Sequence, residues 1–375
     1  MKVNKWTLGL AALGLVSLAS AAKADEKQPT YLETALSSTT ISGYVDTSFE
    51  WQMCNQDGVG IPFRGDNKRD GFNLNVVKLS LEKPLDESEW ASGYKVDLLF
   101  GPDAVGYNPI QQSGGGGFVA RNEGFGIKQA YVNLRAPIGN GVEFKVGTFD
   151  TIIGYEVFEA GSNPNFSRSW GWNTEPTQHT GVLGSYRVSD LVSVSAGVAN
   201  TLTAGINARN TDNGGDDYWC KTYMGSIAVT APEDWGWAAG STLYGGIVSG
   251  WAGGSEDQNN YYAGLTLNTP VAGLTAGLAF DSVCNLGGDD GLNADVLGVY
   301  ASFQATEKMS LHGRAEFGWW EDNGDDADSL SLTGTVQYDL WQNVLSRLEL
   351  RYDQICWDSG KEESVAFYAN IIYKF

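Results

Sequence analysis

The sequence predicts an all-β fold, a transmembrane antiparallel up-and-down β-barrel of sixteen strands, although the pattern also accommodates 14 or 18 strands. Three observations predict it. Segments of about ten residues, each alternating apolar and polar side chains, follow one another to the C-terminus. The segments that join them are short and long in turn, and aromatic residues gather near the strand ends. A soluble β-sandwich has no reason to alternate its loop lengths so regularly.

The N-terminus predicts export. Lys2 and Lys5 precede an apolar stretch, 8–19, and Ala22 and Ala24 are the small residues that a signal peptidase requires. We therefore expect residues 1–24 to be a signal peptide. The alternative, a short membrane anchor, is disfavoured because the apolar stretch is too short to span a bilayer comfortably. The domains that follow are a short periplasmic N-terminal segment, 25–39, and the outer-membrane β-barrel, 40–375.

The first strand, about 41–51, has the clearest alternation. Ile41, Val45 and Phe49 share one face, whereas Asp46 and Glu50 lie on the other. The remaining strands are expected at about 72–83, 92–101, 125–137, 141–150, 178–188, 191–201, 219–231, 237–250, 260–269, 273–283, 294–305, 308–320, 329–340, 344–355 and 364–375. The long connections are 53–71, 102–124, 151–177 and 202–218. An even strand count places both termini at the rim with the short turns.

The polar faces of these strands carry charges of both signs. A basic residue facing lipid at mid-depth costs about 2–4 kcal/mol, so these faces are expected to point into the barrel. A barrel of this size is too wide for side chains to fill, which favours an aqueous channel over a plugged lumen. The residues expected to line the pore are Asp46, Glu50, Glu143, Lys145, Arg314, Glu316, Arg347, Glu349, Arg351 and Asp353.

Tryptophans form two expected bands, at the depths that lipid headgroups select. The long-loop band contains Trp51, Trp219, Trp251, Trp319, Trp320 and Trp357. The short-turn band contains Trp90, Trp235, Trp237, Trp341 and also Phe375.

The net charge of −21 disfavours nucleic acid as a partner. Acidic residues concentrate between strands, for example at Asp216, Asp289 and Asp325. Such clusters are either a divalent-cation site at the outer rim or solvated loops. We favour solvated loops because no segment has the spacing of a twelve-residue calcium loop. No metal or cofactor is expected.

Four cysteines, Cys54, Cys220, Cys284 and Cys356, lie in a chain expected to reach an oxidising compartment. All four are expected near the long-loop rim. Because the first and last strands of a barrel meet, Cys54 and Cys356 are the first candidate disulfide, and Cys220 with Cys284 is the second.

The sequence does not predict an enzyme. His179 and His312 are the only histidines, they fall on strands far apart around the wall, and neither has partners that would activate a nucleophile. The run of glycines at 114–117 has no following Lys-Ser/Thr and therefore does not predict a phosphate-binding loop.

The last strand ends on an aromatic residue. Its apolar face includes Phe367, Ile371, Tyr373 and Phe375, and lipid gives such a face a partner. This ending resembles the C-terminal signature of bacterial outer-membrane barrels. That resemblance implies recognition by the outer-membrane assembly machinery, contact with outer-membrane lipid and localisation in the bacterial outer membrane.

The third long connection, 151–177, is unusually aromatic for a solvated loop. It is either a constriction with stacking faces for a solute such as a sugar, or a loop packed against the inner wall or another subunit. We expect its acids to face the basic wall of strands 308–320 and 344–355. The candidate constriction residues are Tyr155, Glu156, Glu159, Arg168, Trp170 and Trp172.

Several runs between residues 126 and 181 resemble the putative β-barrel porin-2 family. They are Gly126–Leu134, Phe144–Phe149, Ile153–Glu156, Asn165–Ser169 and His179–Gly181. The family is similar to general porins, in which the third loop folds inward and narrows the pore. The resemblance implies a passive channel for small hydrophilic solutes and ions, with no catalytic residues, and a homotrimer as a candidate assembly. A solute-selective channel for sugars or cations and a closed structural or adhesive barrel stay as alternatives.

Overall fold

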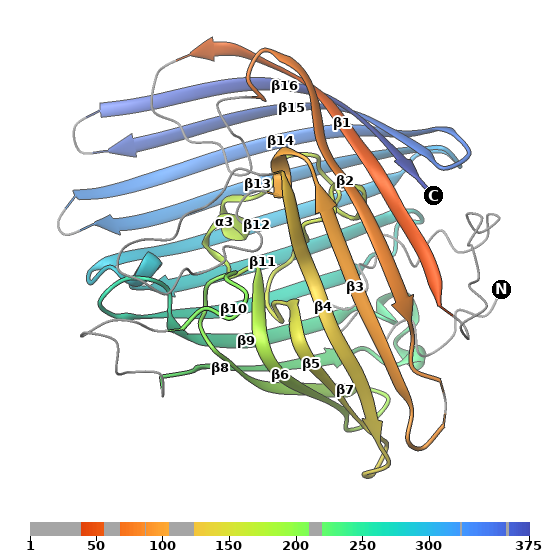
Figure 1. Cartoon of the computed structure of the whole chain (residues 1–375). Coiled ribbons are helices and arrows are strands. Elements are labelled where there is room, and N and C mark those ends of the chain that lie inside the picture. Colours follow the sequence, from red (N-terminus) through yellow and green to blue (C-terminus); the bar gives the residue numbers. More distant parts are fainter. Residues whose placement is uncertain are drawn as a thin grey trace.

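The computed structural model describes residues 39–55, 68–86, 88–104, 124–209, 220–322, 325–357 and 360–375. Sixteen antiparallel strands in these residues form one closed barrel in which each strand pairs with its neighbours in sequence and β16 pairs with β1 (Figure 1). The predicted fold class and strand count are therefore confirmed. The predicted signal peptide and most of the segment 25–39 lie outside the described residues.

The observed strands lie close to the predicted ones. Their bounds are β1 Thr40–Asn55, β2 Gly71–Lys83, β3 Ser92–Phe100, β4 Phe125–Ala136, β5 Val142–Asp150, β6 Gln178–Arg187, β7 Val192–Ala199, β8 Thr222–Thr230, β9 Thr242–Trp251, β10 Asp257–Asn268, β11 Leu274–Cys284, β12 Leu292–Gln304, β13 Met309–Asp322, β14 Asp325–Trp341, β15 Val344–Trp357 and β16 Gly360–Lys374. β9 begins later than expected because a short 3-10 turn, Glu233–Ala238, precedes it.

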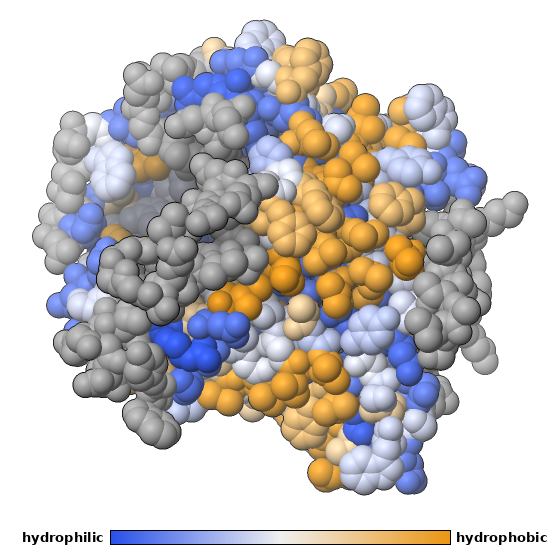
Figure 2. All heavy atoms as spheres, in the orientation of Figure 1, coloured by the Kyte–Doolittle hydropathy of each residue, from blue (hydrophilic) through white to orange (hydrophobic). Residues whose placement is uncertain are grey.

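Alternation assigns one face of each strand to the outside and one to the interior. On β15, Leu348 and Leu350 are 55% and 51% exposed, whereas Arg347 and Glu349 are 2% and 1% exposed. Apolar side chains gather over the outside of the front strands in Figure 2, with hydrophilic residues toward the edges. Within the described chain, no helix is long and apolar enough to cross a membrane.

The chain end closes the barrel. Gly43 donates from its N–H to the Phe375 carbonyl at 2.9 Å and accepts from the Phe375 N–H at 3.0 Å. The predicted lipid-facing residues Ile371, Tyr373 and Phe375 are 49%, 49% and 37% exposed on the outer face. A Cβ on Gly43 would lie 2.2 Å from the Lys78 carbonyl oxygen and 2.7 Å from the Phe375 ring, so this position requires glycine.

The aromatic bands are confirmed only in part. Trp90 and Trp341 at the short-turn rim are 75% and 70% exposed, and Trp51 at the opposite rim is 50% exposed. Three tryptophans expected in the long-loop band were misplaced. Trp251 is buried, and Trp320 and Trp357 pack against an apolar cluster inside the barrel. Trp320 and Trp357 have inward parity on their strands, which overrides their depth. Trp251 instead has the outward parity of Ile247, and its indole N–H donates to the Gly254 carbonyl at 2.9 Å. Trp219 lies outside the described residues.

Among the described residues, three apolar clusters lie in the lumen, between the connection 151–177 and the inner wall. One contains Phe166 and Trp170 of the connection with wall residues of β12 and of β14–β16. A second contains Ile153 with Phe149, Val248 and their neighbours on β5–β12. The third joins Phe158 of the connection to inward residues of β2 and β3. The inner wall is therefore less uniformly polar than the sequence analysis expected.

Candidate functional site: the third loop and the inner wall

Residues 151–177, which we call the third loop, leave β5 and return to β6 through the interior of the barrel. The Thr151 N–H donates to the Thr177 carbonyl at 3.1 Å and closes the base of the loop. A short helix, α3 (Trp170–Thr174), lies within the ring of strands (Figure 1). The Ser169 hydroxyl caps α3 by accepting from the Trp172 N–H at 3.0 Å, because a helix start leaves such donors unpaired.

One part of the loop is fixed by two charged residues of β15. The Glu349 carboxylate accepts from the N–H groups of Phe166 and Ser167 at 2.6 Å and 2.9 Å. Arg347 donates to the carbonyls of Ala160 and Asn163 at 2.7 Å and 2.6 Å. These backbone groups would otherwise be buried without partners, so the wall charges satisfy the loop's main chain.

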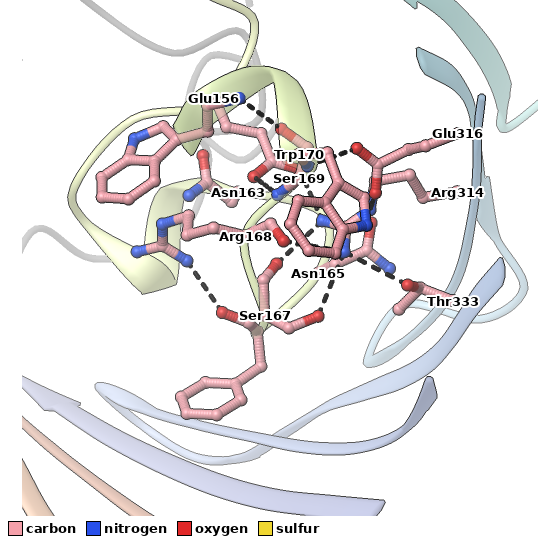
Figure 3. Close-up of polar contacts among 12 residues, drawn as sticks. Glu156, Asn163, Asn165, Ser167, Arg168, Ser169, Trp170, Arg314, Glu316 and Thr333 are labelled. Atoms are coloured by element: carbon pink, nitrogen blue, oxygen red, sulfur yellow. Dashed lines mark hydrogen bonds and ion pairs between the residues drawn. The ribbon is translucent and has the colours of Figure 1, made fainter. Parts of the chain in front are cut away.

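Arg314 on β13 is the centre of a second contact, drawn in Figure 3. Its guanidinium binds Glu156 of the loop at 2.7 Å and Glu316 of its own strand at 2.9 Å. It also donates to the Ser167 carbonyl at 2.8 Å. Glu316 in turn accepts from the Trp170 N–H at 2.6 Å. The expectation that loop acids face the basic wall is confirmed for Glu156.

Arg351 and Asp353 of β15 form a third contact. Arg351 binds Asp353 through two nitrogens, at 2.7 Å and 2.8 Å, and donates to the Arg168 carbonyl. Asp353 also accepts from the Trp170 indole N–H at 3.2 Å. Arg168 is fully buried and donates to the loop carbonyls of Phe158 and Phe166, so it braces the loop from within.

Glu159 does not face the basic wall of β13 and β15, where the sequence analysis expected it. It binds Lys78 of β2 at 2.5 Å and Lys128 of β4 at 3.3 Å. Burial alone would raise the pKa of Glu159, but Lys128 and Lys78 outweigh this effect and hold its pKa well below the usual range. The loop therefore contacts basic groups on two separate stretches of the wall, and periodicity could not say which acid would meet which.

The two ends of the loop contact β10, β11 and β12. Tyr155 stacks on Tyr300, with ring centroids 4.0 Å apart. Asn260 donates to the Thr174 carbonyl at 2.8 Å. Glu175 is hydrogen-bonded to Asp281, and burial, followed by repulsion from Asp281, raises the pKa of Glu175 well above its usual value.

Three predicted pore-lining arginines, Arg314, Arg347 and Arg351, point inward as expected, but they do not face water. Their exposed fractions are 2%, 2% and 0% because the third loop covers them. Most of the other predicted pore-lining residues are also inward and buried, namely Asp46, Glu50, Lys145, Glu316, Glu349 and Asp353. Glu143 is half-buried.

Sequence reasoning missed the apolar residues that seat the loop. Leu345 and Ile355 of β15 share the inward face with Arg347, and both belong to the cluster around Phe166 and Trp170. The sequence contained the information, because Leu345 and Ile355 alternate in step with the charged inward residues that lie between them on β15. Lipid-facing and loop-facing apolar residues are the same residue types, so only parity distinguishes them.

The tryptophans of the loop differ in position. Trp170 is 7% exposed and meets Trp320 edge-on, with centroids 5.8 Å apart. It therefore offers no free stacking face. Trp172 is half-buried, with the Arg168 guanidinium 5.8 Å from its ring.

Below the third loop, toward the short turns, the inner wall is less covered. We call this region the short-turn vestibule. Half-buried inward residues here include Glu82, Lys95, Tyr131, Asn133, Tyr244 and His312. Their inward parity and partial exposure indicate a polar, water-accessible space at this end of the barrel.

Neither predicted disulfide forms, because Cys220, Cys284 and Cys356 are free thiols. Cys54 lies opposite Val365 of β16, whose partner on β15 is Tyr352, four residues short of Cys356. Two strand spacings and four residues separate these cysteines by roughly 16 Å, well beyond the ~7 Å that a disulfide allows. Cys220 lies just before β8 and Cys284 ends β11. With β9 and β10 between them, β8 and β11 are roughly 14 Å apart.

The two histidines occupy separate strands of the wall. His179 is fully buried on β6, where its ring contacts Thr151, and His312 contacts Ser302 across β12 and β13. Among the described residues, no group of three or more His, Cys, Asp or Glu side chains is arranged to hold a metal ion. The acidic cluster around Asp216 lies outside the described residues.

Comparison with solved structures finds outer-membrane channels of the same fold. The outer membrane channel DcaP of Acinetobacter baumannii has a TM-score of 0.61 at 11% identity, covering 92% of this chain and 99% of that one. OmpT of Vibrio cholerae in its trimer form has a TM-score of 0.57 at 13% identity, with coverage of 90% and 99%. The anion-selective porin from Comamonas acidovorans has a TM-score of 0.55 at 12% identity, with coverage of 90% and 99%.

No curated protein sequence matches the chain. A family model, described as "Putative beta-barrel porin-2, OmpL-like", matches residues 38–375, which is nearly all of the chain. Those residues include every strand of the barrel and the whole third loop. The chain therefore belongs to this family of β-barrel porins.

Proposed function

We propose that this protein is a passive diffusion channel of the bacterial outer membrane for small hydrophilic solutes and ions. The short-turn vestibule is the observation that carries the proposal. It has a polar, half-buried inner wall, whereas the outer face of the same strands is apolar. Water is thus the expected medium on the inside and lipid on the outside.

The third loop is proposed to set the size limit of the channel. It crosses the interior and is fixed to β13 and β15 on one side and to Lys78 and Lys128 on the other. Glu156, Glu159, Arg168 and Trp170 would then hold the constriction in place, and the half-buried Tyr155 and Trp172 would border it.

The assembly machinery is proposed to recognise β16, and a homotrimer is proposed by analogy with the trimeric form of OmpT. Residues 1–24 are proposed to be the cleaved signal peptide.

Liposome swelling tests the size limit. Purified barrel in multilamellar liposomes is expected to admit pentoses and hexoses quickly and trisaccharides slowly, because the loop occupies much of the lumen. A swelling rate no greater than that of empty liposomes for every sugar would contradict a diffusion channel.

A closed structural barrel is the second candidate. It is supported by the nearly complete burial of the inner wall at the level of the loop, where Arg351, Asp353 and Asn165 are all 0% exposed. Ion conductance separates the two functions, because a closed barrel conducts neither sugars nor small ions.

A further inference from the structure

Four lysines face the interior on four adjacent strands, and three of them are neutralised. Lys78 binds Asp97 at 2.9 Å, and Lys95 binds Glu82 at 3.2 Å. Lys128 of β4 binds both Asp150 and Glu159. Each of these cations therefore has a carboxylate of the protein as its partner.

Lys145 of β5 is the exception. It is 9% exposed, and among the described residues it makes no hydrogen bond or ion pair. Its ammonium lies 5.0 Å from the centroid of the Tyr131 ring. Burying a cation without an anion is costly, and a ring face compensates for only a small part of that cost.

Two further polar groups next to Lys145 lack partners. Asn133 lies directly opposite Lys145 in the β4–β5 register, and its buried side-chain carbonyl accepts no hydrogen bond. The Tyr131 hydroxyl likewise makes no hydrogen bond with a described residue. All three side chains face the interior, and Tyr131 and Asn133 are half-buried at the wall of the short-turn vestibule.

The neighbouring acids do not fill this gap. The carboxylates whose negative charge acts on Lys145 are Asp150, Glu82 and Glu143. Asp150 and Glu82 are already bound to other lysines. Glu143 lies two residues nearer the short turn on the same strand and forms no ion pair with Lys145.

From this arrangement we infer that Lys145, Tyr131 and Asn133 form a binding subsite for a small organic oxyanion that carries hydroxyl groups, such as a sugar acid. The ammonium and the phenol hydroxyl donate to the carboxylate of the solute. A neighbouring solute hydroxyl donates to the unpaired carbonyl of Asn133. Access from solution rests on the proposed channel function, whereas occupancy of the subsite does not require conduction.

Calorimetric titration of the folded barrel in detergent micelles tests the subsite without any need for conductance. Gluconate is the probe, and its neutral analogue glucitol and inorganic phosphate are the comparisons. Gluconate should bind at least about tenfold more tightly than either, because only gluconate offers both a carboxylate and adjacent hydroxyls.

Variants locate the binding. Lys145→Gln should weaken gluconate binding about tenfold, whereas Lys145→Arg should largely retain it. Lys308→Gln, which removes an equal charge at an exposed turn, should leave the affinity unchanged. Equal gluconate affinity in the wild type and Lys145→Gln, or phosphate affinity equal to that of gluconate, would overturn the inference. Conductance measured separately on the same sample tells whether the channel function holds.

Discussion

Arg347 illustrates what alternation determines for a single residue. Parity places Arg347 and its neighbour Leu348 on opposite faces of β15, so Leu348 is exposed on the outside and Arg347 is buried inside. The partners of Arg347, the carbonyls of Ala160 and Asn163, lie far away in sequence. Parity therefore predicts the direction of a wall side chain, but the partner depends on how a distant loop folds over it.

Glu349 should be critical for holding the third loop. The Glu349 carboxylate accepts from two buried N–H groups, one on each oxygen. Glu349→Gln replaces one of these oxygens with an NH2 group, which cannot accept and would point its hydrogens at a loop N–H. We expect a loss of roughly 2–3 kcal/mol in the free energy of unfolding. The measurement is urea unfolding in lipid vesicles, with Glu307→Gln, at an exposed turn, as the matched control. A variant that unfolds at the wild-type midpoint would refute this role for Glu349.

Glu175 should make stability depend on pH. Its raised pKa means that the folded state binds more protons than the unfolded state at pH values above the usual glutamic acid range. The contribution of this residue to stability is thus present at low pH and decreases as pH rises through the raised pKa. Glu175→Gln, which mimics the protonated carboxyl, should flatten this part of the profile. An identical stability profile in both proteins between pH 5 and pH 9, roughly the range that spans such shifts, would count against the assignment.

The existence of the third loop was predictable from the sequence, but its contacts with the wall were only partly predictable. Length and aromatic content set the loop apart in the sequence, and Glu156 meets the basic wall as expected. Glu159 pairs with lysines of β2 and β4 instead. The inward apolar residues Leu345 and Ile355 went unrecognised because the sequence does not say that a loop, rather than water, covers them.

Replacing Arg314, Arg347 and Arg351 together with Glu should release the third loop. If these arginines faced water, as their pore-lining assignment implies, the change would leave folding intact and favour cations. The structure leads to a different expectation, because each arginine donates to buried loop groups. Breaking a single buried pair costs about 3–5 kcal/mol, so the variant should lose its resistance to proteolysis within 151–177. Resistance to proteolysis equal to that of the wild type would argue against this role of the three arginines.

Phe375 should be required for closure of the barrel. Its main chain pairs with Gly43 of β1, and its ring lies over that residue on the lipid face. Deletion of Phe375 is expected to reduce the amount of heat-modifiable protein in the outer membrane several-fold. Phe303→Ala, at another lipid-facing aromatic, serves as the control. Wild-type levels after the deletion would rule out this requirement.

At the scale of the whole molecule, the strand count and the fold followed from period-two alternation and loop lengths. Those features are local, so each strand could be read from its own residues, and closure needs only that β16 meet β1. The state of the lumen is not local. Residues predicted to line water, such as Arg351 and Asp353, are instead buried under a loop that begins about two hundred residues earlier in the chain.

The third loop is proposed to limit an otherwise open channel. Single-channel recording in planar bilayers tests it, with the wild type compared with a variant in which Ala160–Asn165 is replaced by a short glycine linker. The wild type should conduct in discrete steps, and the variant should conduct in larger steps, because the contacts of Arg347 with the loop are lost and the lumen widens. Absence of conductance in both proteins, or equal step sizes, would contradict this role of the third loop.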